Sequence, residues 1–316
     1  MNLSDGMYFK ALRLMVHSDA RTVLQSAINS PYRWWYESLR CSKDYWWVCQ
    51  QKGKTYDSDL RKVWENFGDV FAFDFPRWWV VHGVDIFKEK VAPPSIRIVE
   101  SSRENLQINS EFITLRVPTN ISRRSLFKQF REIVDSLGEI RVRRGDSTFP
   151  LDKVKRVRID IYETALRVFH YRNLMNFQNQ SDFDPGIKNL SLYEIGSLFN
   201  VSPSHKRKAG ESIDSRILKE RVMRVAVIRM TKRAEQLISN AEVGCFPSYI
   251  PREPNRRWTK AQIRQRDDAL MSGGFVNLGI SDVNTLEIDR IIEESREFFE
   301  RRLGSRRLKD RHAPSL

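Results

Sequence analysis

Apolar residues recur at helical spacing through most of the chain. The segments 19–29 and 57–71 carry apolar side chains three and four residues apart, and Asp57 or Ser58 is placed to cap the second segment. The same period covers five further segments, at 122–139, 159–177, 215–240, 259–271 and 281–303. Among the apolar positions of the segment 215–240 are Ile217, Leu218, Val225 and Ile228. This periodicity predicts a mainly α-helical protein.

A short stretch in the middle of the chain has a different period. Pro93 and Pro94 end the first helical part, because two prolines in a row stop regular structure. The segments 95–101 and 111–118 then alternate apolar and polar residues as strands do, and the helical segment 122–139 follows them. Gly138 is placed to end that helix. The pattern predicts a small α/β unit.

These changes of pattern predict a multi-domain chain with four parts. Residues 1–92 form a Trp-rich helical domain, and residues 93–150 form the small α/β unit. Residues 151–250 form a helical domain that includes a long helix, and residues 251–316 form a helical region with a basic tail. A chain of 316 residues is long enough for several hydrophobic cores.

The segment 191–203, SLYEIGSLFNVSP, resembles a helix-turn-helix. Its apolar residues are spaced to face one way: Leu192, Ile195 and Phe199. Gly196 stands where two helices would approach closely, and Asn200 stands where the turn needs a left-handed backbone, which Asn tolerates. Val201 is expected to lie under the turn, and Ser202 is placed to cap a second helix.

The resemblance implies a trihelical region in which the helix at 162–177 supports the other two. Two features depart from the usual motif: Lys206 stands where an apolar residue is expected, and Gly210 argues against a long helix that begins at Ser202. Two alternatives remain for the DNA-binding element. Either the recognition helix is short, or 204–212 is a basic loop and the long helix at 215–240 enters the groove of DNA. An ordinary helical hairpin with a solvated basic loop is the third interpretation.

The charge of the chain favours a polyanionic partner. There are 54 Lys and Arg against 40 Asp and Glu, which gives a net charge of +14. The segments 123–158 and 201–238 each carry a net charge of +6, so they hold most of the excess. We therefore predict binding to nucleic acid, with duplex DNA as the first expectation and RNA as the alternative.

The residues expected to bind DNA lie in and around these two basic segments. They are Tyr193, Ser202, Ser204, His205, Lys206, Arg207, Lys208 and Arg216, together with Arg141, Arg143, Arg144, Lys155 and Arg156. The side chains from Ser204 to Lys208 would contact bases, and the other cations would hold phosphates. With its aromatic N-terminal part, the chain is similar in general character to DNA-binding proteins of bacterial mobile elements. That resemblance implies a regulator or accessory factor, and its motif covers only about 25 residues.

Seven of the eight tryptophans lie in the first 92 residues, six of them as the doublets 34–35, 46–47 and 78–79. Stacking on bases would need exposed rings in a basic groove. The doublets instead stand among apolar residues at helical spacing, where neighbours diverge by about 100 degrees. One ring of each doublet can thus lie in the core and the other at its rim, and we expect core or protein-interface packing before base stacking. A rival interpretation is an adaptor that docks a protein partner, or a second copy, through Trp34, Trp47, Trp78 and Trp79.

The sequence contains none of the common catalytic or metal-binding motifs. It lacks a phosphate-binding loop, a dinucleotide fingerprint, a nucleophile elbow and a zinc-protease motif. The five histidines are scattered, and the three cysteines include no CxxC pair. No apolar run approaches the about 20 residues of a membrane span. We expect a cytoplasmic, non-enzymatic protein without cofactor, metal or membrane attachment, while an enzyme with an unfamiliar nucleic-acid site stays open as a further alternative.

Overall fold

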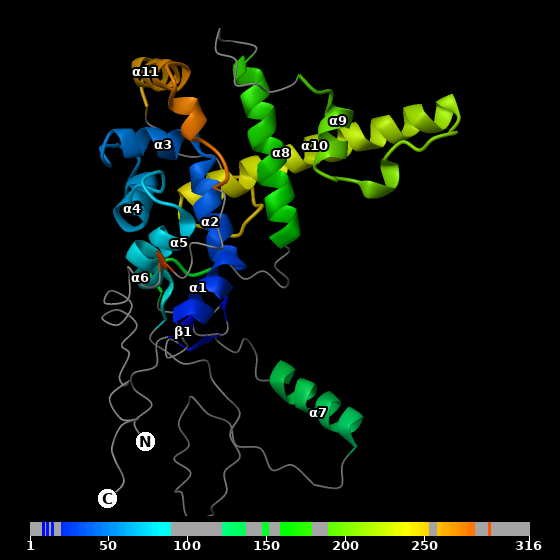
Figure 1. Cartoon of the computed structure of the whole chain (residues 1–316). Coiled ribbons are helices and arrows are strands. Elements are labelled where there is room, and N and C mark those ends of the chain that lie inside the picture. The colour runs from blue at the N-terminus through cyan, green and yellow to red at the C-terminus, as the bar shows by residue number, and fades with distance from the viewer. Residues whose placement is uncertain are drawn as a thin grey trace, which may run out of the picture. The chain divides into compact units, whose positions relative to one another are not determined.

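A computed structural model shows a mainly helical chain, as the periodicity predicts (Figure 1). It describes residues 8–9, 11–12, 14–15, 20–89, 122–136, 147–151, 159–178, 189–252, 258–281 and 290–291. The chain divides into two compact units. The first unit joins residues 1–92 to residues 146–316, and the second comprises residues 93–145.

In the second unit the structure describes one element, helix α7 (Arg123–Ser136). This helix falls inside the predicted segment 122–139, and its Phe127 is 68% exposed. The expected strands at 95–101 and 111–118 lie outside the described residues, as does Gly138. The part of the chain that the structure describes therefore shows no small α/β unit.

The first unit begins with two short strands and a series of short helices. Strands β1 (Tyr8–Phe9) and β2 (Leu14–Met15) pair antiparallel, with Tyr8 opposite Met15. The elements that follow are α1 (Ala20–Ile28), α2 (Pro31–Arg40), α3 (Lys43–Gln50), α4 (Ser58–Phe67), α5 (Phe75–Trp78), the π-helical turn η1 (Trp79–Gly83) and α6 (Val84–Phe87).

Side-chain caps set the ends of these helices. Asp57 caps α4, because its carboxylate accepts a hydrogen bond from the Leu60 N–H at 2.9 Å. Ser30 and Ser42 cap α2 and α3 in the same way. Gly68 follows α4 with a φ of 65°, a left-handed conformation that favours glycine. The helix therefore stops before the predicted end at residue 71.

Helix α2 lies in the middle of the main hydrophobic core. It packs against α1 and α3 and also against the later helices α8 (Ile159–Gln178) and α10 (Ile213–Glu242). Trp35 is fully buried, its ring stacks on Phe246 with centroids 5.5 Å apart, and its Nε1 donates to the Ala241 carbonyl at 3.4 Å. A helix that is covered on several sides buries neighbouring residues as well as residues on one face.

All six rings of the tryptophan doublets are buried, with exposed fractions of 9% or less. The prediction that the doublets pack in the core is therefore confirmed, and no ring of a doublet lies at the rim. The reason is long-range packing: Trp46 and Trp47 of α3 are covered by Leu270 and Leu278 from the C-terminal part of the chain. The proposed docking residues belong to the same cores, and they are Trp34, Trp47, Trp78 and Trp79.

The remaining described elements follow in the second half of the chain. Besides α8 and α10, they are α9 (Leu192–Leu198), the 3-10 turn η2 (Pro203–His205), α11 (Lys260–Met271) and the 3-10 turn η3 (Gly274–Asn277). Helix α10 begins two residues before the predicted start at 215, because the Ser212 side chain accepts a hydrogen bond from the Ser215 N–H at 3.3 Å. Of the predicted helix at 281–303, the described residues include only 281, 290 and 291.

Helix α10 contributes to two hydrophobic cores. Leu237 and Ala241 of its C-terminal half lie in the main core with the tryptophans, together with Leu166 from α8. Val227, nearer its middle, belongs to a smaller core that α8 and α9 complete. The Trp-rich segment and the segment predicted to form a separate helical domain thus share one core. No helix in the described ranges is both long enough and apolar enough to cross a membrane.

Candidate nucleic-acid interface

Helices α8, α9 and α10 form the three-helix packing at the predicted motif. Val168, Ile195 and Val227, one from each helix, are buried against one another. Three further residues of the motif are partly buried on this cluster: Leu192, Phe199 and Val201. The apolar residues of the motif thus pack as their spacing predicts.

The turn after α9 has the predicted backbone, and Gly196 makes the predicted close approach. Asn200 has a φ of 53°, the left-handed region. A Cβ atom on Gly196 would lie 2.5 Å from the Met223 Cγ and 2.9 Å from a methyl carbon of Val227. Both neighbours are on α10, so glycine lets α9 lie directly against that helix.

Replacement of Gly196 by alanine is expected to destabilise the packing of α9 on α10. The added methyl group overlaps Met223 and Val227, and overpacking of this kind costs about 1–3 kcal/mol. Urea unfolding followed by circular dichroism measures the change. Leu198→Ala on the same helix is the control, because Leu198 is 58% exposed and its loss should change stability by less than about 0.5 kcal/mol. Equal stability of Gly196→Ala and the parent protein would contradict the close packing.

Residues 201–212, all of which the structure describes, contain no second α-helix. Ser202 has extended-like angles (φ −142°, ψ 84°) and makes no capping hydrogen bond, so the expectation that it caps a recognition helix is wrong. Pro203 disfavours the helical conformation of the residue before it. The 3-10 turn ends at His205, and the next residue, Lys206, has an extended ψ of 140°. The Arg207 N–H, which a helix would use internally, donates to the Tyr193 hydroxyl at 2.7 Å.

Residues 203–212 therefore form a basic loop between α9 and α10. A basic loop is common to the second alternative for the DNA-binding element and to the interpretation as an ordinary helical hairpin. Tyr193 lies under this loop with only 9% of its surface exposed. The Arg207 guanidinium lies over the Tyr193 ring, 4.4 Å from the ring centroid, in a cation–π contact. Tyr193 is among the residues expected to contact DNA, but its place makes it a positioning residue for the loop.

Ion pairs attach the loop to the first turns of α10. Arg207 binds Glu220 at 2.6 Å, and Lys219 binds Glu211 and donates to the Lys206 carbonyl at 3.3 Å. The Lys219 hydrogen bond is the main cause that lowers the pKa of Glu211. These contacts fix the backbone of the loop, so its cations are presented on an ordered surface.

The polar side chains of the loop have different degrees of exposure. The Ser202 and Ser204 hydroxyls lie 2.8 and 3.0 Å from the His205 Nδ1. Lys208 is exposed, while Lys206 is partly buried. Some of the loop residues that were predicted to contact bases are therefore accessible to solvent, and others are only partly so.

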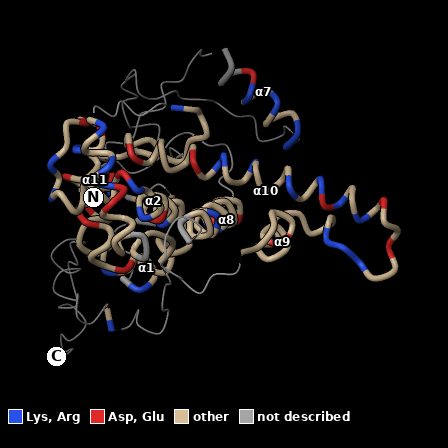
Figure 2. The backbone as a smooth tube through the Cα atoms, turned by 90° about the horizontal axis from the view of Figure 1, so that it is seen from above, with Lys and Arg blue, Asp and Glu red and all other residues tan. Residues whose placement is uncertain are grey.

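Six cations on α10 are exposed: Arg216, Arg221, Arg224, Arg229, Lys232 and Arg233. Figure 2 shows Lys and Arg recurring along this helix and on the loop that precedes it. At 1.5 Å per residue, the stretch from Arg216 to Arg233 covers about 25 Å. We call residues 203–233, the loop with this stretch of α10, the basic arm.

Of these six cations, only Arg216 was predicted as a DNA contact. The other five contribute to the charge of the basic segment 201–238. Because apolar residues stand between them, the sequence alone does not show which face of the helix is exposed. Ile217 and Leu218 are 60% and 62% exposed, and Val225 and Ile228 are each 42% exposed. The exposed side of the arm therefore mixes cations with aliphatic side chains.

The remaining predicted contacts cannot be placed on this surface. Arg141, Arg143, Arg144, Lys155 and Arg156 lie outside the described residues. In the part of the chain that is described, no group of three or more His, Cys, Asp and Glu is arranged to hold a metal ion.

Comparison with known proteins adds no relative. No protein-family model, curated protein or solved structure matches the chain.

Proposed function

We propose that the protein binds double-stranded DNA through the basic arm and acts as a regulator or accessory factor. The observation that carries this proposal is the set of exposed cations distributed along α10 beside an ordered basic loop. Cations spaced along a helix can neutralise phosphates and release their counterions. A net charge of +14 assists the approach of a polyanion over longer distances.

The shape of the arm suits a duplex. An α-helix with its side chains is about 10–12 Å wide, and the major groove of B-DNA is about 12 Å wide. The N-terminal half of α10 would enter or border that groove, with Arg221 and Arg224 at phosphates. The exposed Ile217 and Leu218 would contact thymine methyl groups and sugars.

The loop would contribute the contacts nearest the bases. Ser204, His205 and Lys208 offer donors and acceptors, and Arg207 could exchange its contact with Glu220 for a phosphate or a guanine edge. The rival adaptor function has no comparable support. Its four docking rings are buried in the cores, where a partner could not reach them without unfolding.

Binding of the purified chain to duplex DNA, single-stranded DNA and structured RNA across a salt series tests the proposal. We expect preference for the duplex and a steep, linear fall of log affinity with log salt, since five or more phosphate contacts give a slope of about −4.5 or steeper. Preference for structured RNA would mean that the ligand is RNA and not DNA. Weak binding of all three, without dependence on salt, would refute the proposal.

A further inference from the structure

A small pocket lies apart from the basic arm, between α3, residues 51–56 and α11. Its volume is about 70 Å³. One water molecule needs roughly 10–15 Å³, and pockets for drug-sized ligands need about 300–1,000 Å³. The pocket therefore suits a single ring or a group of that size.

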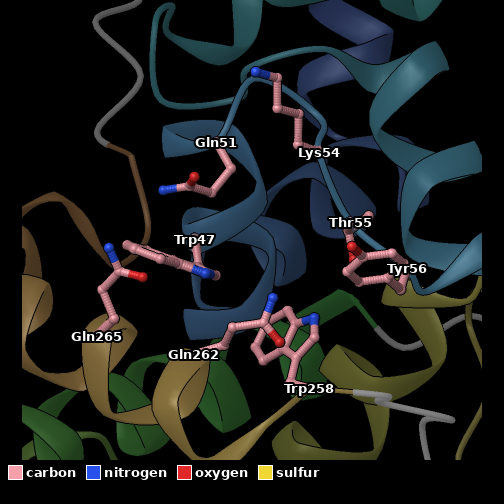
Figure 3. Close-up of a pocket in the computed structure, with 8 residues that line it drawn as sticks. All are labelled: Trp47, Gln51, Lys54, Thr55, Tyr56, Trp258, Gln262 and Gln265. Carbon is pink, nitrogen blue, oxygen red and sulfur yellow. The ribbon is translucent and has the colours of Figure 1, made fainter.

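Three aromatic rings contribute to the walls of the pocket. Figure 3 shows Trp47 of α3 above Trp258, with Tyr56 to one side. The Arg266 guanidinium lies 5.6 Å from the centre of the Trp258 ring and is itself bound to Asp44 and Asp267. Ion pairs thus help to hold this ring in place before any ligand binds.

Three glutamines and one lysine complete the lining: Gln51, Gln262, Gln265 and Lys54. In Figure 3 the ammonium group of Lys54 points away from the aromatic rings. Gln262 is fixed by the cap of α11, since its Oε1 accepts hydrogen bonds from the Thr259 N–H at 2.9 Å and the Thr259 hydroxyl at 3.2 Å. Its amide N–H groups stay available for a ligand.

Several of these polar groups have no hydrogen-bond partner in the part of the chain that the structure describes. Among the described residues, nothing bonds to the side-chain amides of Gln51 and Gln265 or to the indole N–H groups of Trp47 and Trp258. Trp47 is only 9% exposed, so its N–H can meet an external partner only through a small opening. The lining includes a cation and no carboxylate.

We propose that this pocket binds a single nucleobase, with the attached phosphate at Lys54. Flat aromatic rings stack on the face of any base. Amides supply both donors and acceptors, which match the edges of bases. A neutral sugar would also stack on an indole ring, but it would give Lys54 no anion to bind. The base can belong to a free nucleotide or to an unpaired position in a strand.

Cross-linking locates the bound base. 5-Iodouridine monophosphate and an oligonucleotide with one 5-iodouracil are irradiated with the full-length protein, and the cross-linked peptides are identified by mass spectrometry. We expect cross-links at Trp47, Tyr56 or Trp258, and loss of these cross-links when unlabelled nucleotide competes. Cross-links confined to other parts of the chain would overturn the proposal.

Calorimetry measures the contribution of the pocket and the source of the base. The ligands are uridine and adenosine monophosphates and two blunt-ended two-strand duplexes, one fully paired and one with a single bulged base. Binding of the monophosphates identifies a free nucleotide, and preference for the bulged duplex identifies a strand. Either result supports a base-binding pocket. The proposal would be contradicted if the monophosphates did not bind and the bulged base gave no preference. Stronger binding of maltose, a neutral sugar, than of nucleotide would also contradict it.

Variants of exposed residues keep the test independent of folding. Tyr56 is 77% exposed, and Tyr56→Ala should weaken binding of the base about tenfold through loss of stacking. Gln265→Ala should also weaken it, while Gln50→Ala, an exposed glutamine outside the pocket, should not. Unchanged affinity for the base in both Tyr56→Ala and Gln265→Ala would contradict the proposal. The fully paired duplex reports on the basic arm, so failure of the pocket and failure of duplex binding are distinguished.

Discussion

Replacement of Lys206, Arg207 and Lys208 by alanine is expected to weaken binding to duplex DNA about 60- to 500-fold at roughly 0.1 M salt. Each phosphate contact contributes about 0.9 to the slope of log affinity against log salt, so two or three lost contacts produce a change of this size. The range allows for Arg207, which gives up its ion pair with Glu220 when it binds a phosphate. Fluorescence anisotropy with labelled duplex at several salt concentrations measures the affinity and the slope together.

The control for this variant is a second triple substitution that removes the same charge elsewhere. Lys43, Lys260 and Arg264 are exposed and lie outside the basic arm. If the arm is the interface, their replacement by alanine lowers the affinity far less and leaves the slope nearly unchanged. Equal losses in the two triple variants would mean that net charge alone, and no particular surface, accounts for binding.

Replacement of Trp78 and Trp79 by alanine is expected to leave the chain unfolded at 25 °C. Both rings are fully buried, and Trp78 also donates a hydrogen bond from Nε1 to the Phe67 carbonyl at 2.7 Å. Removal of a buried Trp costs about 3–5 kcal/mol. Two such losses approach the whole stability of an ordinary protein, which is about 5–15 kcal/mol. Circular dichroism and the dispersion of methyl signals in a proton NMR spectrum report the outcome.

A matched substitution separates loss of the core from loss of an aromatic side chain. Phe73 is 41% exposed, and Phe73→Ala should keep the fold. If the double tryptophan variant folds with an unchanged melting temperature, the two rings do not contribute to the stability of the fold. Loss of a protein partner in that folded variant would restore the adaptor interpretation.

Helices could be predicted from the sequence where a local signal marks them. Asp57 caps α4 as predicted, whereas the end of α4 before Gly68 and the start of α10 after Ser212 differ from the predicted bounds. Burial could not be predicted in the same way, because it depends on segments far apart in the chain. The ring of Trp47 is covered by residues more than two hundred positions later. Its neighbour Trp46 is buried for the same reason.

The turn of the candidate interface was predictable from the sequence, whereas the choice between a short helix and a loop after the turn was not. Gly196 and Asn200 are local requirements of backbone geometry, and both have the expected role. The loop depends on a tertiary contact, the hydrogen bond from the Arg207 N–H to Tyr193, which spacing alone does not reveal. The pocket at α11 was missed because its glutamines belong to separate segments that meet only in the fold. The spacing of Gln262 and Gln265 is the one signal that places two of them on one helical face.

The 30 residues of α10 connect the basic arm to the tryptophan core without a break. A ligand that binds the arm in its helical form is therefore thermodynamically linked to unfolding of the whole unit. A polyanion at one hundred times its dissociation constant would add about 2.7 kcal/mol to the free energy of unfolding. The heat resistance of the tryptophan core would then depend on how much nucleic acid surrounds the protein, although the basic arm itself contains no tryptophan.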